Sequence, residues 1–96
     1  MNDICDAIGN LNLINFHYDG HPRVVEPHTY GLDTKGHLAL RAFQVRGSSK
    51  SGQGPYWRIF HRDKIHDITV LQETFAGQRD GYRKGDPVFS TIYCEL

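Results

Sequence analysis

Short runs in which apolar and polar residues alternate, separated by turn-forming residues, most constrain what this chain can fold into. Residues 11–18 (LNLINFHY) alternate in this way, and Asp19-Gly20, a typical hairpin turn, follows directly. The next turn signal is at residues 33–36 (DTKG). Turns at this spacing leave room for strands but not for long helices. The pattern therefore predicts a mainly β fold.

Further segments have strand character. Residues 37–45 (HLALRAFQV) alternate most clearly, and residues 23–32 (RVVEPHTYGL) contain Pro27, which places that part at an edge or a bend. A small, bent five-stranded antiparallel barrel over residues 11–71 fits this order, because closure removes exposed strand edges. The remaining predicted strands are residues 56–62 (YWRIFHR), 65–71 (IHDITVL) and 88–96 (VFSTIYCEL).

The length of 96 residues fits one domain, residues 1–96. A short helix is expected at residues 2–9, because its apolar residues fall at helical spacing and Gly9-Asn10 can end it. A C-terminal extension with one strand, residues 74–96, follows the barrel. Aromatic residues of this extension are expected to seal the barrel or to form a partner surface: Phe75, Tyr82 and Phe89.

Charge is balanced overall but unevenly distributed. Eleven Lys and Arg match 11 Asp and Glu, so a protein that coats nucleic acid by bulk charge is not expected. Residues 23–64 nevertheless carry eight basic and three acidic side chains, and the segments on either side are acidic. This basic middle indicates either a local anion-binding surface or a solvated strand face that is rich in arginine.

Two cysteines, Cys5 and Cys94, are too few for a disulfide framework or a structural zinc site. No apolar run approaches the roughly 20 residues of a membrane span, and the acidic start MNDICD does not resemble a signal peptide. We therefore expect a soluble cytoplasmic protein without a membrane partner, in which both cysteines are free thiols.

The strand predicted at residues 37–45 places an arginine beside an aromatic ring. Its purely apolar face, which includes Leu38 and Leu40, is expected in the core, so Arg41 and Phe43 lie on the opposite face. Guanidinium groups bind phosphate, and rings stack on bases at about 1–3 kcal/mol each. Such a face suits a nucleotide or single-stranded nucleic acid.

The strand predicted at residues 56–62 repeats this arrangement. Trp57 and Ile59 are expected in the core, which leaves Arg58, Phe60 and Arg62 on the opposite face. In the alternative interpretation, the phenylalanines are themselves core residues, and the arginines extend into solvent from the barrel ends. Taken alone, the two strands favour this alternative.

The remaining motifs give no sign of catalysis or of a metal site. Residues 47–55 (GSSKSGQGP) lack the spacing of a phosphate-binding loop and are expected to form a mobile hairpin loop. The six histidines show no ligand spacing, and no nucleophile-elbow pattern surrounds Ser48, Ser49 or Cys94. We therefore expect a binding protein with no cofactor, no metal and no enzymatic activity.

Taken in order, the strand motifs resemble the WYL-domain family, small Sm-like (SH3-type) barrels of bacterial regulators and defence-associated proteins. Residues 23–27 (RVVEP) are similar to the family's R-x-V-x-P strand, and residues 36–43 (GHLALRAF) stand where the strand that names the family would be. Residues 58–65 (RIFHRDKI) are similar to its R-x-F-x-x-x-[RK]-I strand. With Ala7-Ile8 and INFHY, the resemblance covers about residues 4–71.

The resemblance implies an effector-sensing module that binds a nucleotide or single-stranded nucleic acid through basic residues on the barrel. Leu38 and Ala39 replace the family's Trp and Tyr, and no helix-turn-helix precedes the barrel. The chain is therefore not expected to read DNA as a regulator on its own. The residues carried over by position are Arg23, Arg58 and Lys64, to which the strand faces add Arg41, Phe43, Phe60 and Arg62.

Two functions remain open from the sequence. The leading hypothesis is a stand-alone, ligand-sensing module for single-stranded nucleic acid or a nucleotide. The alternative is a protein-interaction or assembly module with a protein partner or a second copy, because Sm-like barrels often associate through strand edges. Salt separates the two, since phosphate binding weakens steeply between about 50 and 200 mM salt.

Overall fold

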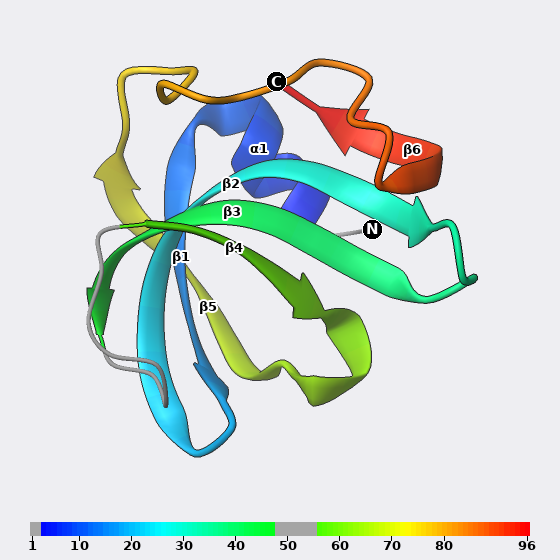
Figure 1. The fold of residues 1–96 in the computed structure, drawn as a ribbon. Coiled ribbons are helices and arrows are strands. Elements are labelled where there is room, and N and C mark those ends of the chain that lie inside the picture. Colours follow the sequence, from blue (N-terminus) through cyan, green and yellow to red (C-terminus); the bar gives the residue numbers. More distant parts are fainter. Residues whose placement is uncertain (1–2, 48–55) are drawn as a thin grey trace.

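The structure is a computed structural model that describes residues 3–47 and 56–96. One short helix comes first, as expected, and six strands follow it (Figure 1). The predicted loop at residues 47–55 lies, apart from Gly47, outside the described residues. The elements are α1 (Asp3–Asn10), β1 (Asn12–Tyr18), β2 (His21–Asp33), β3 (Leu38–Gly47), β4 (Tyr56–His61), the 3-10 turn η1 (Arg62–Lys64), β5 (His66–Thr74) and β6 (Phe89–Glu95).

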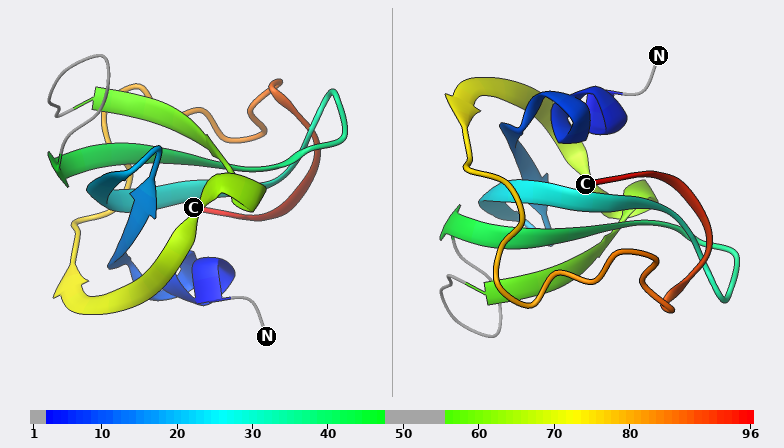
Figure 2. Two further views of the ribbon diagram at one scale, coloured as in Figure 1. Left: turned by 90° about the horizontal axis from the view of Figure 1, so that it is seen from below. Right: turned by 90° about the horizontal axis from the view of Figure 1, so that it is seen from above.

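All strands belong to one antiparallel sheet. Five of them lie in the order β4-β3-β2-β1-β5, and β6 pairs with β2. The sheet is strongly bent, with α1 on one side of β2 and β3 and the segment between β5 and β6 on the other (Figure 2). The mainly β class, the antiparallel pairing and the N-terminal helix are thus as predicted.

The core lies between α1 and the concave face of the sheet. The apolar face predicted for the helix is buried, with Ile4, Ala7 and Ile8 at most 2% exposed. These side chains pack against Phe16 of β1 and Leu40 of β3. Other core residues come from every strand of the five-stranded path except β5: Ile14, Tyr18, Val25, Tyr30, Ala42 and Phe60, with Ile65 beyond η1.

Strand β2 is the centre of the sheet, although the sequence also allowed an edge for it. It pairs with β3 along nearly its whole length, with a register shift between Pro27 and Thr29. On its other side, residues 21–25 pair with β1, and residues 29–33 pair with β6. Pro27 lies between these two partners and at the register shift in the ladder with β3, both of which are positions that tolerate a residue without an N–H. It therefore marks a bend within a central strand.

Strand β4 faces the opposite way from the prediction. Phe60 is 0% exposed and lies in the core, opposite Leu40 of β3, whereas Trp57 is half-buried on the outer face. Leu38, expected in the core, is 39% exposed. The prediction failed because the segment between β5 and β6 also covers the outer face. Both faces of β4 therefore carry aromatic residues, and alternation cannot show which one is the core.

Phe60 offers a direct test of this face assignment. The change Phe60→Ala should lower the free energy of unfolding by about 3–5 kcal/mol, because it removes a fully buried ring. Leu38→Ala, at an exposed position of the neighbouring strand, should change it far less. Urea denaturation measures both. A loss of less than about 1 kcal/mol in Phe60→Ala would contradict the assignment, because it would indicate that the ring lies at the surface.

The cysteines correct a second expectation. Cys5 and Cys94 are not free thiols but form a disulfide that joins α1 to β6, with the two Cα atoms 5.6 Å apart. They are 89 residues apart in sequence, and sequence spacing gave no sign that the fold brings them together. Disulfides persist mainly in oxidising compartments, so the cytoplasmic location remains only a prediction. The described part of the chain contains no helix with the length and hydrophobicity of a membrane span.

The disulfide should contribute strongly to stability. A cross-link that closes almost the whole chain restricts the unfolded state, so its loss should cost about 2–5 kcal/mol. We expect reductant to lower the denaturation midpoint of the wild type to that of the double variant Cys5→Ser/Cys94→Ser, which should not respond. Two free thiols per unreduced chain, with no effect of reductant, would contradict the cross-link.

Candidate ligand-binding pocket

The seven predicted site residues do not share one face. Strand pairing places Arg58 and Phe60 on the concave face with Ala42 and Leu40, and it places Arg41 and Phe43 on the outer face. Arg62 and Lys64 lie on η1, beyond the end of β4. The predicted arginine and aromatic surface is therefore divided between the two sides of the sheet.

Arg23 is a buried cation with neutral acceptors. It is 1% exposed, and its guanidinium donates to Gln44 Oε1 at 3.2 Å and to the carbonyl of Tyr18 at 3.1 Å. The same group lies 5.7 Å from the centre of the Phe60 ring. Burial lowers the pKa of Arg23, and the nearby Arg58 guanidinium lowers it further. In this conformation the hydrogen bonds of Arg23 lie within the interior, and the side chain does not reach a phosphate in solvent.

The other concave-face and η1 cations lie nearer the surface. Arg58 is half-buried, donates to the hydroxyl of Tyr56 at 2.9 Å and lies over that ring at 5.3 Å. Arg62 donates to the carbonyl of Ile65 at 3.4 Å, and Lys64 is exposed. These three cations belong to separate contacts and do not form one ligand site.

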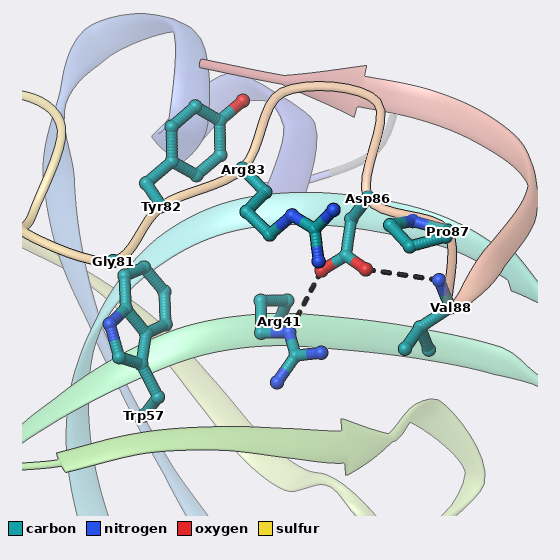
Figure 3. Close-up of a pocket in the computed structure, with 8 residues that line it drawn as sticks. All are labelled: Arg41, Trp57, Gly81, Tyr82, Arg83, Asp86, Pro87 and Val88. Carbon is teal, nitrogen blue, oxygen red and sulfur yellow. Dashed lines mark hydrogen bonds and ion pairs between the residues drawn. The ribbon is translucent and has the colours of Figure 1, made fainter.

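A pocket of about 290 Å³ opens instead on the outer face, under the segment between β5 and β6 (Figure 3). Strand β3 contributes Arg41 to it and β4 contributes Trp57. Trp57 and Tyr82 stand at one end, and the guanidinium groups of Arg41 and Arg83 lie in the middle (Figure 3). The full lining is Arg41, Trp57, Gly81, Tyr82, Arg83, Asp86, Pro87 and Val88.

Asp86 orients Arg41 in the pocket. The Nε of Arg41 donates to Asp86 Oδ2 at 3.1 Å, and the carboxylate, 9% exposed, also accepts the backbone N–H of Val88 at 3.0 Å. Among the described residues, neither Nη group of Arg41 has a hydrogen-bond partner. Arg83 is exposed, and it forms no ion pair with an acidic side chain among the residues that the structure describes. Two guanidinium groups thus retain donors for an anion.

Trp57 is held as one wall of the pocket. Its Nε1–H donates to the carbonyl of Asp80 at 2.9 Å, and its ring meets Phe43 and His28 edge to face at 5.5 and 4.7 Å. Gly81 has a φ of +92°, and a Cβ there would lie 2.9 Å from Trp57 Nε1. Glycine therefore permits both the turn and its close approach to the indole.

His28 forms the floor of the aromatic cluster beneath this segment. It is 0% exposed and packs against Tyr82 at 5.3 Å and Phe75 at 5.5 Å. Its Nδ1–H donates to the carbonyl of Glu26 at 2.8 Å, and its Nε2 accepts the backbone N–H of Arg79 at 3.1 Å. The contact with Arg79 requires an unprotonated Nε2 and therefore the neutral ring, and burial lowers the pKa of His28.

The segment is also fixed at two further points. The guanidinium of Arg79 forms two hydrogen bonds with the carboxylate of Glu26, at 2.9 and 3.1 Å, and lies 4.4 Å from the centre of the Phe43 ring. Tyr82 donates to the carbonyl of Leu96 at 2.7 Å. Residues 79–82 are thereby attached to β2 and to the end of the chain.

Sequence reasoning missed most of this pocket. Of its lining residues only Arg41 was predicted to meet a ligand. Trp57 was expected in the core, Tyr82 was expected to seal the barrel or to form a partner surface, and no site was predicted in the turn-rich residues 77–87. The available signal was the group of aromatic and charged residues at 82–86 (YRKGD) within that turn-rich stretch. Its place over β3 and β4 depends on tertiary packing.

The comparisons with known proteins give no relative. No family model matches the chain, and neither the curated proteins nor the solved structures contain a match. The interpretation of the pocket therefore depends on its own chemistry.

His28 predicts a pH dependence of folding. Its pKa is lower in the folded protein than its ordinary value of 6.5, so the unfolded chain binds the proton more tightly. Stability should be retained above about pH 6.5 and should fall below it, by at most about 1.4 kcal/mol per pH unit from this one group. Denaturation of wild type and His28→Gln between pH 7.5 and 4.5 isolates this effect. If the free energy of unfolding changed with pH equally in the two proteins, His28 would not be the cause of the pH dependence.

Proposed function

We propose that the outer-face pocket binds one nucleotide, either free or as a unit of single-stranded nucleic acid. The observation that carries this proposal is that two guanidinium groups and two aromatic rings line a single cavity, where the sequence had suggested arginine and aromatic pairs on exposed strands. The volume of about 290 Å³ lies near the lower limit of small-ligand pockets. It suits one base and its phosphate rather than a folded partner.

The lining residues divide this task between two kinds of contact. Arg83 and the Nη groups of Arg41 would bind the phosphate by charge-assisted hydrogen bonds. Trp57 and Tyr82 would stack on the base. Asp86, held by Arg41 and the N–H of Val88, would position the guanidinium. We propose a binding role rather than a catalytic one.

We also propose that the bent sheet is an Sm-like barrel of the WYL type. The antiparallel order β4-β3-β2-β1-β5, the helix before it and the single 3-10 turn between β4 and β5 support this assignment. The ligand would then lie on the outer face beneath residues 79–88, not at the basic positions that the resemblance carries over. Of those positions, Arg23 is too deeply buried to meet a ligand in this conformation.

The single tryptophan provides the test. Because Trp57 lines the pocket and is the chain's one tryptophan, binding of thymidine monophosphate or a short oligothymidylate should quench its fluorescence. Arg83→Gln should weaken binding of both probes. For the oligothymidylate it should also reduce the salt slope by about 0.7, because one phosphate contact of a single strand is lost. Comparing the two probes shows whether one nucleotide is sufficient.

Lys84→Gln is the matched control. Lys84 is exposed, adjoins Arg83 and does not line the pocket, so its loss removes the same charge without the contact. It should retain most of the affinity. No quenching by either probe at about 50 mM salt, or equal losses in the two variants, would contradict the proposal.

The alternative function, a protein-interaction or assembly module, also has a structural observation in its favour. Strand β5 pairs with β1 alone among the described strands, so its other edge is open. Val70 on β5 is 41% exposed, and Tyr93 on β6 is 54% exposed. Open edges and exposed rings suit a protein partner or a second copy. If neither nucleotide probe binds, this alternative predicts association that increases with concentration in sedimentation.

A further inference from the structure

A second group of titratable side chains shares no residue with the outer-face pocket. Asp33 ends β2, His37 comes just before β3, and His61 ends β4. Each offers one ligand atom, and these three atoms lie within 4.8 Å of one another. Both histidines are among the six that show no ligand spacing in the sequence, which gave no sign that the fold brings them together with Asp33.

Strand pairing brings the two histidines together. His61 pairs with Ala39, so His37, two residues before Ala39, is its diagonal neighbour across β3 and β4. The two imidazole rings are stacked, with centres 5.2 Å apart and planes at 29°. His37 is exposed on the turn, whereas the backbone of His61 is fixed by the sheet. One ring can therefore move toward the other.

Asp33 supplies a carboxylate that is already oriented. Its Oδ1 accepts the backbone N–H groups of Lys35 and His37 at 2.9 and 2.8 Å. Its Oδ2 faces Nδ1 of His37 at 3.5 Å. The backbone bonds act as the outer contacts that fix a metal ligand.

We propose that Asp33, His37 and His61 bind a divalent transition-metal ion of the Zn²⁺ class. Two imidazoles with one carboxylate form a common protein donor set for Zn²⁺, in which a fourth position is open. Donor atoms around tetrahedral Zn²⁺ are about 3.3 Å apart, so the present spacing must shorten by roughly 1–1.5 Å. Rotation of the exposed His37 side chain can supply this.

The open position would face an adjoining cavity of about 420 Å³. Its lining residues are Gly36, His37, Leu38, Arg62 and Asp63. Water or an anion held by Arg62 could occupy that position. Nitrogen donors disfavour Ca²⁺ and Mg²⁺, and both cysteines are in the disulfide, so no thiolate competes for the ion.

Calorimetric titration of untagged, oxidised protein with Zn²⁺ near neutral pH tests the site. We expect one ion per chain. His37→Gln and His61→Gln should each weaken binding by about tenfold or more, and Asp33→Asn should do so while keeping the turn, because its amide oxygen can still accept the two backbone N–H groups. Melting temperatures measured in EDTA show that the variants are folded.

His17→Gln is the matched control. His17 on β1 pairs with His66 on β5, and its Nδ1 lies 3.7 Å from Oδ2 of Asp67. It thus has an aspartate and a second histidine nearby, but these three do not bring their ligand atoms together as Asp33, His37 and His61 do. Its zinc affinity should equal that of the wild type. Absence of saturable binding by the wild type would overturn the proposal, as would unchanged binding in His37→Gln and His61→Gln. Loss in His17→Gln alone would place the ion elsewhere and also overturn it.

Discussion

The pairing of β2 is the constraint on which the rest of this structure depends. One strand joins β3 on one side and, on the other, first β1 and then β6. Pro27 stands at the change of partner, and just beyond it the carbonyl of His28 accepts the backbone N–H of Leu96 at 3.0 Å. Because β2 is buried from residue 25 to residue 31, it must be covered on both faces. The helix and core cover one face, and residues 75–88 cover the other.

This double coverage explains why the outer face carries a pocket. A single core is small in a chain of this length, so a second packed layer and a disulfide between the first helix and the last strand add stability that the core alone would lack. The second layer is partly polar. It includes the Arg79–Glu26 pair and the neutral His28, whose buried groups are all matched by partners. Beside this layer lie Arg41 and Arg83, the two guanidinium groups of the proposed nucleotide site.

Local pattern predicted much of the fold, and tertiary packing decided the rest. The turn at Asp19-Gly20, the buried helix face and the succession of strands along the chain followed from spacing and alternation, which act within a few residues. The faces of β4 did not, because Trp57 and Phe60 are both aromatic and both sides are covered. The disulfide and the Asp33–His37–His61 cluster join residues far apart in sequence. For the candidate site, the sequence predicted a combination of arginine and aromatic side chains and named Arg41. That these side chains meet under residues 79–88 could not be predicted, because it depends on the tertiary fold.

The central claim is that the outer face, not the basic concave face, receives the ligand. Amide NMR titration with thymidine monophosphate locates the contact most directly. The indole N–H of Trp57, which donates to the carbonyl of Asp80, gives a separate signal from within the pocket. We expect the largest shifts at that N–H, at Arg41 and across residues 81–88. Shifts confined to Arg58 and its neighbours on the concave face, or to the open edge of β5, would contradict the claim.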